Sequence, residues 1–370
     1  MSELATLNYT NRMSLITTPA TRMLGITQPI LLAGMGYTSG AELAAAVSNA
    51  GGLGVVGGLG YTPDALREIL TDLKSKLRDP SLPFGVDLLI PQVGGKARKT
   101  NVDYTRGQLM ELIDIIVEEG AKLFVSAVGI PPKAVVDKLH AAGVLYMNMV
   151  GHPKHVHKAC EVGADLVCAQ GGEAGGHTGE IPTSVLIPAC ADACKGYVSP
   201  LTGEPVQLVA AGGMFDGRSI AAALMYGAGA VWVGTRFVTA RESNAPEGGK
   251  QAIIDAGFDS FVRTTLWSGR PIRAMATPYL IDWETNRRAE INELQSKGII
   301  VLDYELERLE KEGKLTDEII DQTTQRPMGY GASMVNKKNQ TAAEIVLEMT
   351  VEAYTILKGA DRYISSVSKL

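Results

Sequence analysis

Apolar, β-branched runs alternate with amphipathic segments along most of this chain. The runs lie at residues 28–35, 52–57, 84–90, 122–128, 144–150, 165–169, 207–211 and 230–235, and we expect each to form a strand. Helical patterns cover residues 41–50, 63–77, 106–119, 132–142 and 153–161, and further helices are expected to begin near Pro182, Asp216 and Thr341. The pattern therefore predicts eight successive strand–helix units.

Strands that are apolar throughout are typical of a parallel sheet covered by helices on both faces. Eight such units predict a closed (β/α)8 TIM barrel, with the functional groups at the carboxyl ends of the strands. A doubly wound open sheet is the structural alternative, and it usually carries an early Gly-x-Gly-x-x-Gly. Residues 52–57 match that expression. Their glycines lie within an apolar run and not between a strand and a helix, so the barrel is favoured.

A long segment, residues 241–331, separates the eighth predicted strand from the last helix. Its middle, residues 283–325, is highly charged and predicts one or two amphipathic helices packed on the barrel. We therefore expect a barrel formed by residues 1–240 and 332–370, with a helical insertion at 241–331 that acts as a lid or a subunit contact.

Composition narrows the functional classes. The chain has 370 residues, of which 45% are hydrophobic and 20% charged, as expected for a soluble enzyme with a large core. A net charge of −5 provides no general field for binding nucleic acid. No apolar run is long enough to span a membrane, and the N-terminus lacks a signal-peptide pattern.

Two further features bear on metals and location. The four cysteines, Cys160, Cys168, Cys190 and Cys194, include no Cys-x-x-Cys pair, so small buried residues are favoured over a zinc site. The chain ends in Ser368-Lys369-Leu370, the tripeptide that the peroxisomal import receptor binds. We expect a peroxisomal enzyme if the source is eukaryotic and a cytoplasmic one otherwise.

The strongest chemical signal directly follows the sixth predicted strand. Residues 170–179 read Gln-Gly-Gly-Glu-Ala-Gly-Gly-His-Thr-Gly, with five glycines among ten residues. Such a loop brings main-chain N–H groups close to a flat or anionic ligand, and it carries one imidazole, His177. A histidine there can transfer protons near neutral pH or stabilise developing negative charge, so we predict that His177 is the catalytic residue.

Two other strand ends predict a phosphate site. Ala210-Ala211-Gly212-Gly213 closes the seventh strand, and Gly234-Thr235-Arg236 closes the eighth. The loops after these two strands commonly bind phosphate in TIM barrels, through backbone amides. A single phosphate held there is what FMN would present.

At residues 170–179 the signature Gln-Gly-x-Glu-Ala-Gly-Gly-His-x-Gly resembles that of the nitronate monooxygenases, formerly called 2-nitropropane dioxygenases. Weaker matches support it at four strand ends: Ala33-Gly34-Met35, Phe84-Gly85-Val86-Asp87, Ala211-Gly212-Gly213 and Gly234-Thr235-Arg236-Phe237. The likeness covers residues 25–240 and the final helix, and it implies a TIM barrel that binds FMN.

The resemblance also implies roles for single residues. Ala33, Gly34 and Met35 would border the isoalloxazine ring, and His177 would face the substrate. The remaining cofactor-binding residues would be Asp87, Gln170, Gly175 and Gly176 at the flavin, and Gly212, Gly213, Val233, Gly234 and Thr235 at the phosphate. No metal is expected.

The chain departs from the family pattern at two places. Relatives often carry Asn where Asp87 stands, and a carboxylate cannot donate a hydrogen bond unless it is protonated. They also often carry Gly-Gln where this chain has Gly331-Ala332. Both departures put a flavin or substrate contact in question.

The implied reaction is the FMN-dependent oxidation of alkyl nitronates by O2 to carbonyl compounds and nitrite. The first alternative is an FMN-dependent NAD(P)H:quinone or enoyl-thioester reductase on the same barrel. A second is a flavin-free barrel, either an isomerase or a binding protein for a phosphate ligand. The third, a metal enzyme using His152, His155 and His157, is disfavoured because His157 would point away from the other two on a helix.

Overall fold

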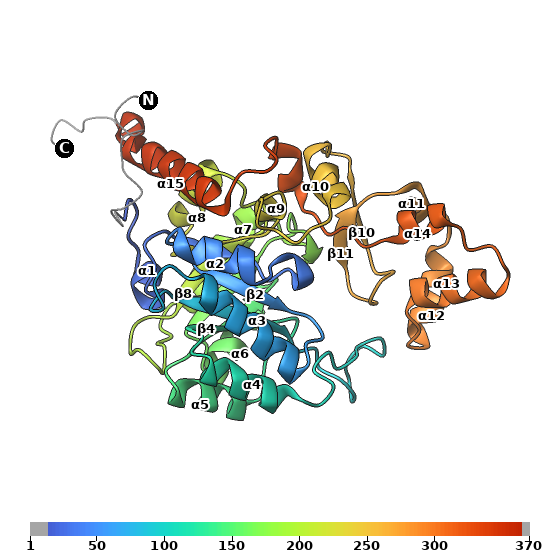
Figure 1. Ribbon diagram of the computed structural model, residues 1–370, viewed down its shortest axis with the longest axis horizontal. Helices are drawn as coiled ribbons and strands as arrows, with labels where there is room; N and C mark the ends of the chain where they lie inside the picture. Colours follow the sequence, from blue (N-terminus) through green and yellow to red (C-terminus); the bar gives the residue numbers. More distant parts are fainter. Residues whose placement is uncertain (1–13, 365–370) are drawn as a thin grey trace.

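The computed structural model describes residues 14–364, and the predicted peroxisomal tripeptide Ser368-Lys369-Leu370 lies outside the described residues. Eight parallel strands form the central barrel: β1 (Ile30–Leu32), β2 (Gly54–Gly58), β3 (Phe84–Leu89), β4 (Leu123–Ala127), β5 (Leu145–Val150), β6 (Leu166–Gln170), β8 (Gln207–Ala211) and β9 (Ala230–Val233). They are hydrogen-bonded in the order β1-β9-β8-β6-β5-β4-β3-β2, and a parallel bridge between Leu31 and Leu53 joins the two ends. The predicted TIM barrel is confirmed (Figure 1).

Eight helices surround the strands: α2 (Ala41–Asn49), α3 (Pro63–Lys76), α4 (Leu109–Glu118), α5 (Lys133–Ala141), α6 (Lys154–Val162), α7 (Thr183–Cys194), α8 (Gly217–Met225) and α15 (Ala342–Lys358). The ring is completed by α15, which packs against α8 and α2 although it follows the insertion in sequence. In the part of the chain that the structure describes, no helix combines the length and apolar content needed to cross a bilayer.

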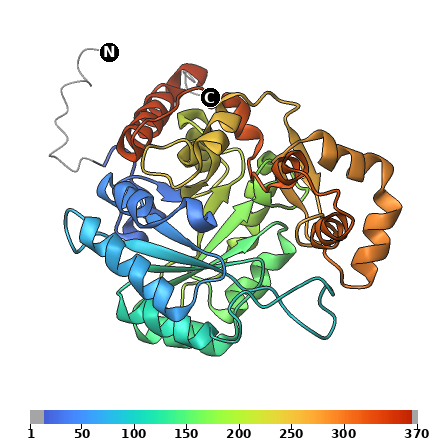
Figure 2. The same cartoon turned by 45° about the vertical axis from the view of Figure 1, so that its right-hand side comes forward.

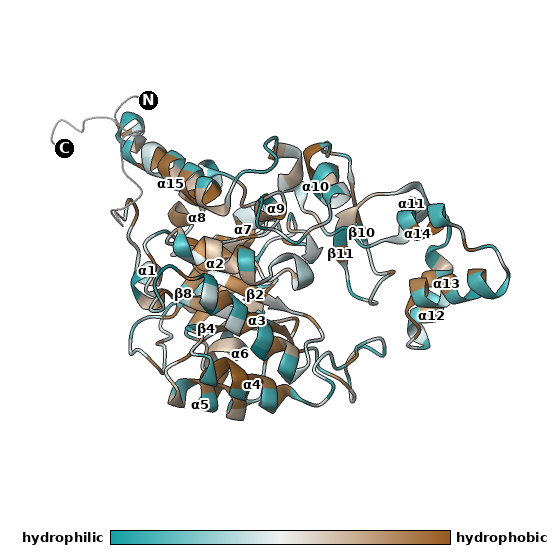
Figure 3. Cartoon of the chain, viewed as in Figure 1, coloured by the Kyte–Doolittle hydropathy of each residue, from teal (hydrophilic) through white to brown (hydrophobic). Residues whose placement is uncertain are grey.

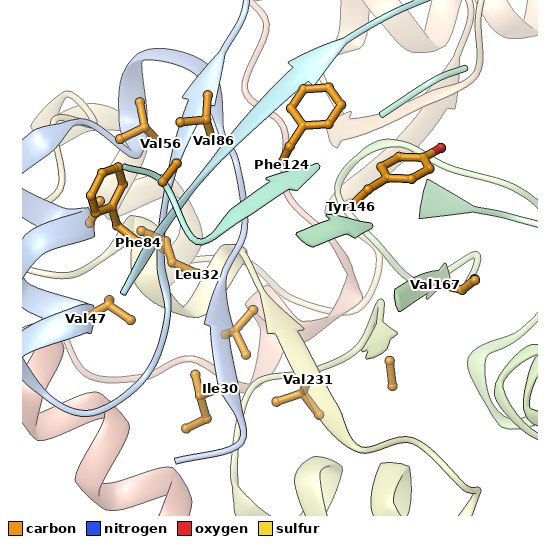
Figure 4. Close-up of a cluster of buried hydrophobic side chains, with 14 of the residues drawn as sticks. Ile30, Leu32, Val47, Val56, Phe84, Val86, Phe124, Tyr146, Val167 and Val231 are labelled. Atoms are coloured by element: carbon orange, nitrogen blue, oxygen red, sulfur yellow. The ribbon is translucent and has the colours of Figure 1, made fainter. Parts of the chain in front are cut away.

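Side chains of successive strand residues separate into two apolar layers. On β1, Ile30 and Leu32 face the surrounding helices, whereas Leu31 points into the barrel. Figure 4 shows the outer layer, in which Phe124 and Tyr146 from neighbouring strands lie side by side. This period of two explains why each strand reads as an uninterrupted apolar run, since both of its faces are buried.

A short helix, α1 (Pro19–Leu24), closes the amino-terminal end of the barrel. Its Ala20 and Leu24 are fully buried among the inward-facing strand residues. Thr18 caps the helix and donates a hydrogen bond from its hydroxyl to the carbonyl of Gly229, over a distance of 2.6 Å. The alternating strand–helix pattern did not predict this plug.

Short elements and the insertion complete the fold: η1 (Gly36–Thr38), β7 (Gly176–His177), α9 (Thr235–Val238), α10 (Glu247–Ile254), β10 (Phe261–Thr264), β11 (Ile272–Met275), α11 (Pro278–Asn286), α12 (Arg288–Ser296), α13 (Val301–Lys311), α14 (Asp317–Thr323), η2 (Tyr330–Met334) and η3 (Ala360–Tyr363). The four helices α11–α14 exceed the one or two expected. Their outer faces are hydrophilic in Figure 3, while Trp283 is buried in a small apolar core between them.

The insertion also contains a hairpin that was not expected. Strands β10 and β11 pair antiparallel, and β11 pairs in turn with β7, so that Ile272 lies opposite His177. The insertion thereby shares a three-stranded sheet with the glycine-rich loop of the barrel. The division of the chain at residues 240 and 332 stays a prediction.

The glycines at residues 52–57 have a packing role. A Cβ atom at Gly54 would overlap the carbonyl oxygen of Ala44 in α2, and one at Gly57 would lie 2.5 Å from the backbone nitrogen of Met35. Because these glycines have no side chain, β2 can approach α2 and the loop after β1 closely. Close packing of β2 therefore accounts for the Gly-x-Gly-x-x-Gly match at residues 52–57, and no dinucleotide-binding role is needed to explain it.

We expect Gly54→Ala to lower the free energy of unfolding by about 2 kcal/mol, because atoms forced into a packed core typically cost about 1–3 kcal/mol. Urea unfolding followed by circular dichroism would measure the change. Gly248→Ala is the matched control, since a Cβ there meets nothing within 4 Å, and it should leave stability equal or slightly higher. Equal unfolding midpoints for the two variants would contradict this account.

Candidate active site

A cavity of about 1510 Å³ opens at the carboxyl ends of the barrel strands. It is bordered by the loops after β1, β3, β6, β8 and β9, and by the insertion. The structure brings nearly all of the predicted site residues to its wall: Ala33, Gly34, Met35, Asp87, Gln170, Gly175, Gly176, His177, Gly212, Gly213, Gly234 and Thr235.

Val233 is the exception among the predicted residues. Its side chain is fully buried in the layer between strands and helices, and its carbonyl accepts a hydrogen bond from the N–H of Ala33 at 2.9 Å. The residue therefore supports the cavity wall from behind and is not part of its lining.

His177 is held by both the barrel and the insertion. The side-chain amide of Gln170, at the end of β6, donates to the carbonyl of His177. Its ring Nε2 lies 3.1 Å from the hydroxyl of Ser268, which belongs to the turn between β10 and β11. Burial lowers the pKa of His177 to about 4, and the nearby Arg270 guanidinium adds to the effect. The imidazole is therefore neutral at pH 7 and able to accept a proton.

Asp87 is buried beneath the cavity, with only 2% of its surface exposed. Its carboxyl group packs so tightly on the backbone of Gly34 that a Cβ at position 34 would overlap it. One carboxyl oxygen, Oδ1, has no hydrogen-bond partner among residues 14–364, and burial raises the pKa of Asp87 to about 8. At pH 7 the side chain is mostly a neutral acid, which can donate a hydrogen bond as an asparagine does.

The glycine-rich loop is shaped by contacts with the protein as well as by the cavity. A Cβ at Gly175 would lie 2.7 Å from the backbone nitrogen of Gly329, so the loop and the end of the insertion touch backbone to backbone. The carboxylate of Glu173 accepts hydrogen bonds from the backbone N–H of Thr183 at 2.9 Å and from its hydroxyl at 2.6 Å. Part of the glycine content therefore serves backbone packing as well as the expected ligand contact.

The loop after β8 turns on two consecutive glycines in the left-handed region. Gly212 has a φ of 88° and Gly213 a φ of 72°, conformations that other residues rarely adopt. The hydroxyl of Thr183 lies 3.0 Å from the carbonyl of Gly212 and ties this loop to α7. In the neighbouring loop, the hydroxyl of Thr235 accepts a hydrogen bond from Gly329 N–H at 3.2 Å.

Several cavity residues were missed because they come from outside the strand–helix pattern. Arg98 and Tyr104 lie in the long loop between β3 and α4, while Trp267, Ser268 and Arg270 lie in the β10–β11 turn. The hairpin has a weak sequence signal: the short alternating runs Phe261–Thr264 and Ile272–Met275 flank the turn residues Ser268-Gly269-Arg270-Pro271. The partner of that hairpin, β7, is too short to be predicted from its own sequence.

The second departure from the family pattern is at Ala332. Ala332 is fully buried in a small apolar cluster, whereas its neighbour Gly331 lines the cavity. No polar side chain reaches the cavity from position 332.

The histidines considered as metal ligands are separated. His152 and His155 line the cavity, with ring centroids 5.8 Å apart, but His157 contacts the hydroxyl of Tyr197 instead. Within residues 14–364 no group of three His, Cys, Asp or Glu side chains is placed to hold a metal ion. The four cysteines are free thiols, buried except for the half-buried Cys160.

Comparisons with known proteins agree with this geometry. The family model described as nitronate monooxygenase matches residues 17–352. A "probable nitronate monooxygenase" of Staphylococcus saprophyticus is 31% identical over 300 residues, which cover 72% of this chain and 80% of that protein. A Mycobacterium tuberculosis protein is 36% identical over 272 residues, 74% of this chain and 70% of its own length. It is named "(3aS,4S,5R,7aS)-5-hydroxy-7a-methyl-1-oxo-octahydro-1H-indene-4-carboxyl-CoA dehydrogenase".

Solved structures show the same fold. FabK from Thermotoga maritima has a TM-score of 0.75 and 28% identity, covering 94% of this chain and 100% of its own. A nitroalkane oxidase from Streptomyces ansochromogenes has a TM-score of 0.72 and 24% identity, covering 92% and 99%, and it supports the fold alone. The family match spans most of the chain and the named relatives are oxidoreductases, so this chain is an oxidoreductase that belongs to the nitronate monooxygenase family.

Proposed function

We propose that this chain is an FMN-dependent enzyme that oxidises alkyl nitronates with O2 to carbonyl compounds and nitrite. The observation that carries the proposal is the neutral imidazole of His177, held at the wall of a large glycine-lined cavity by Gln170 and Ser268. The family match supports it.

The residues at the cavity fit a flavin. Asp87 lies beside Gly34 and is mostly neutral at pH 7. Its buried Oδ1 has no hydrogen-bond partner among the described residues, so it is free to bind a polar atom of a flavin. We assign the ring to the surface of Ala33, Gly34 and Met35, next to this acid. The phosphate is assigned to the loops after β8 and β9, because Gly212, Gly213 and Gly234 line the cavity and loops at these positions commonly bind phosphate through backbone N–H groups.

FMN, when bound, supplies the acceptor for the electrons that leave the substrate. The residues of this chain orient the substrate and handle its proton. A neutral His177 can hydrogen-bond a nitronate oxygen, or take a proton from carbon if a neutral nitroalkane enters the site. Because Ser268 holds one ring nitrogen, the imidazole keeps a single orientation during either task.

A second candidate substrate is an acyl thioester of coenzyme A. The specific observation in its favour is the cavity, whose 1510 Å³ exceeds the space needed by a flavin and a small nitronate. Two arginines at its wall, Arg98 and Arg270, have no carboxylate partner among the described residues. The Mycobacterium tuberculosis relative is named for a carboxyl-CoA compound, which agrees with this choice.

Anaerobic mixing tests the two candidates directly. The purified protein should be yellow, and propyl-2-nitronate should bleach the flavin absorbance within seconds. Bleaching by NADH or NADPH and reoxidation by an enoyl-CoA, with no response to the nitronate, would replace the first candidate by the second. A colourless protein that takes up no FMN on reconstitution would contradict both.

Replacement of His177 should separate catalysis from cofactor binding. We expect His177→Asn to reduce kcat/KM for neutral nitroethane by about 100-fold or more, as for loss of a general base, with FMN retained. In the wild-type enzyme, kcat/KM should stay level from pH 7 down to about pH 5 and fall only near pH 4, because the pKa of His177 is lowered. A fall centred near 6.5, or loss of flavin from the variant, would contradict this role.

Asp87 gives a pH-dependent prediction for cofactor binding. If its neutral acid donates to the flavin, FMN affinity should weaken about tenfold per pH unit above pH 8, where Asp87 ionises. Asp87→Asn keeps the donor at every pH, so its FMN affinity should stay constant. Flavin fluorescence titrations from pH 7 to 9.5 would measure both, and parallel curves for the two proteins would contradict the assignment.

The same shift predicts the stability of the flavin-free protein. The pKa of Asp87 is raised on folding from 3.8 to about 8, so the folded protein holds a proton that the unfolded chain releases. Between these values, stability should fall by about 1.4 kcal/mol per pH unit through this group. Asp87→Asn should lack that component and be more stable than wild type at pH 7.5, as measured by urea unfolding.

A further inference from the structure

Two guanidinium groups come together at the cavity wall beside His177. Nη1 of Arg98, in the loop between β3 and α4, donates to the carbonyl of Gly269 at 2.9 Å. The next residue, Arg270, donates from Nε to the side-chain oxygen of Asn101 at 3.1 Å. Each arginine thus contacts the segment that carries the other, and both line the cavity. We call them the Arg98–Arg270 pair.

The pair lacks an acidic partner in the part of the chain that the structure describes. Of the other cavity arginines, Arg263 is ion-paired with Glu180 at 3.2 Å and Arg326 with Asp321. Within residues 14–364, neither member of the pair forms an ion pair with an aspartate or glutamate. Burial lowers the pKa of Arg270, and the positive charge of Arg98 lowers it further.

The remaining acidic groups of the cavity do not offset this charge. Asp87 is mostly protonated at pH 7, and the carboxylate of Glu173 is bound by Thr183. Two like charges held close together cost free energy unless an anion joins them. The two arginines therefore leave the cavity wall beside His177 positively charged, which favours binding of an anion.

The pair is also held in a fixed position. Gly269 has a φ of 66°, and a Cβ there would overlap the side chain of Thr100, so the two segments touch closely. Nζ of Lys99 donates to the carbonyl of Ser296 at 2.7 Å, which ties the same loop to the helices of the insertion. Figure 2 shows residues 91–108 reaching toward these helices. These contacts hold the two segments that carry the arginines, which reduces the entropy lost when a ligand binds.

We propose that the Arg98–Arg270 pair binds an anionic oxygen group of the substrate next to His177. This inference rests on the proposed function only in naming the ligand as substrate. The anion has two possible sources: the nitronate oxygens themselves, or a phosphate of a coenzyme A or nicotinamide nucleotide tail. In either case the guanidiniums provide the positive charge that a neutral His177 lacks, and guanidinium groups suit oxyanions because they bind them in a bidentate manner.

Isothermal titration calorimetry of the FMN-loaded protein tests the proposal without turnover. The probes are nitrate, inorganic pyrophosphate and coenzyme A, and the variants are Arg98→Gln and Arg270→Gln. Arg326→Gln is the matched control, because it removes one positive charge from the same cavity but from an arginine already paired with Asp321. We expect at least one probe to bind about tenfold more weakly to each variant of the pair, and less than twofold more weakly to the control.

The probes distinguish the two sources. Loss of nitrate binding, with nitrate competing against propyl-2-nitronate, would assign the pair to the reacting group. Loss of pyrophosphate and coenzyme A binding alone would assign it to a nucleotide tail. Equal weakening in all three variants, or none in any, would overturn the proposal.

Two further measurements keep the test decisive. Arg270→Lys retains the charge but loses the bidentate guanidinium, so it should bind the probe more weakly than wild type and more strongly than Arg270→Gln. Circular dichroism would show whether each variant folds. If Arg270→Gln does not fold, the exposed Arg98 still provides the test through Arg98→Gln. If the protein binds the anion through the pair but does not react with nitronates, the proposed function is wrong and this inference still holds.

Discussion

The candidate active site depends on one backbone pairing, that of β7 with β11. Two residues of the glycine-rich loop, Gly176 and His177, form the short strand that receives the hairpin of the insertion. This pairing places Ser268 against the imidazole and Arg270 beside it. A second backbone contact, between Gly175 and Gly329, fastens the loop to the other end of the insertion. His177 is therefore positioned by a segment that lies about 90 residues away in the chain.

Burial decides the protonation of the two titratable groups nearest the assigned flavin. His177 loses its proton more readily and Asp87 holds its proton more strongly, because a charge on either would be poorly solvated. Both are therefore mainly uncharged near pH 7. Charge in the cavity comes instead from arginines, which stay cationic when partly buried. The proposed proton transfer and the proposed charge stabilisation are thus assigned to different side chains.

The departure at Asp87 shows how a local substitution is absorbed. An asparagine at this position would donate a hydrogen bond at any pH, and a carboxylate would not. The surrounding backbone of Gly34 and the strands of the barrel exclude water from the side chain, and this keeps the acid protonated. The sequence alone leaves this contact in doubt because desolvation is a property of the folded environment.

The sequence by itself determined the barrel, because each strand is buried on both faces and reads as an apolar run between helical patterns. It also indicated most of the predicted residues that line the cavity, since loops that follow such strands meet at one end of a barrel and the glycine-rich loop carries a single imidazole. It did not indicate that Val233 supports the wall from behind, or that several glycines serve backbone contacts. Only the tertiary structure decided what stands opposite His177. Ser268 and Arg270 come from a hairpin with only a weak sequence signal, and Arg98 comes from a loop with none. Their positions depend on long-range backbone pairing that local sequence does not encode.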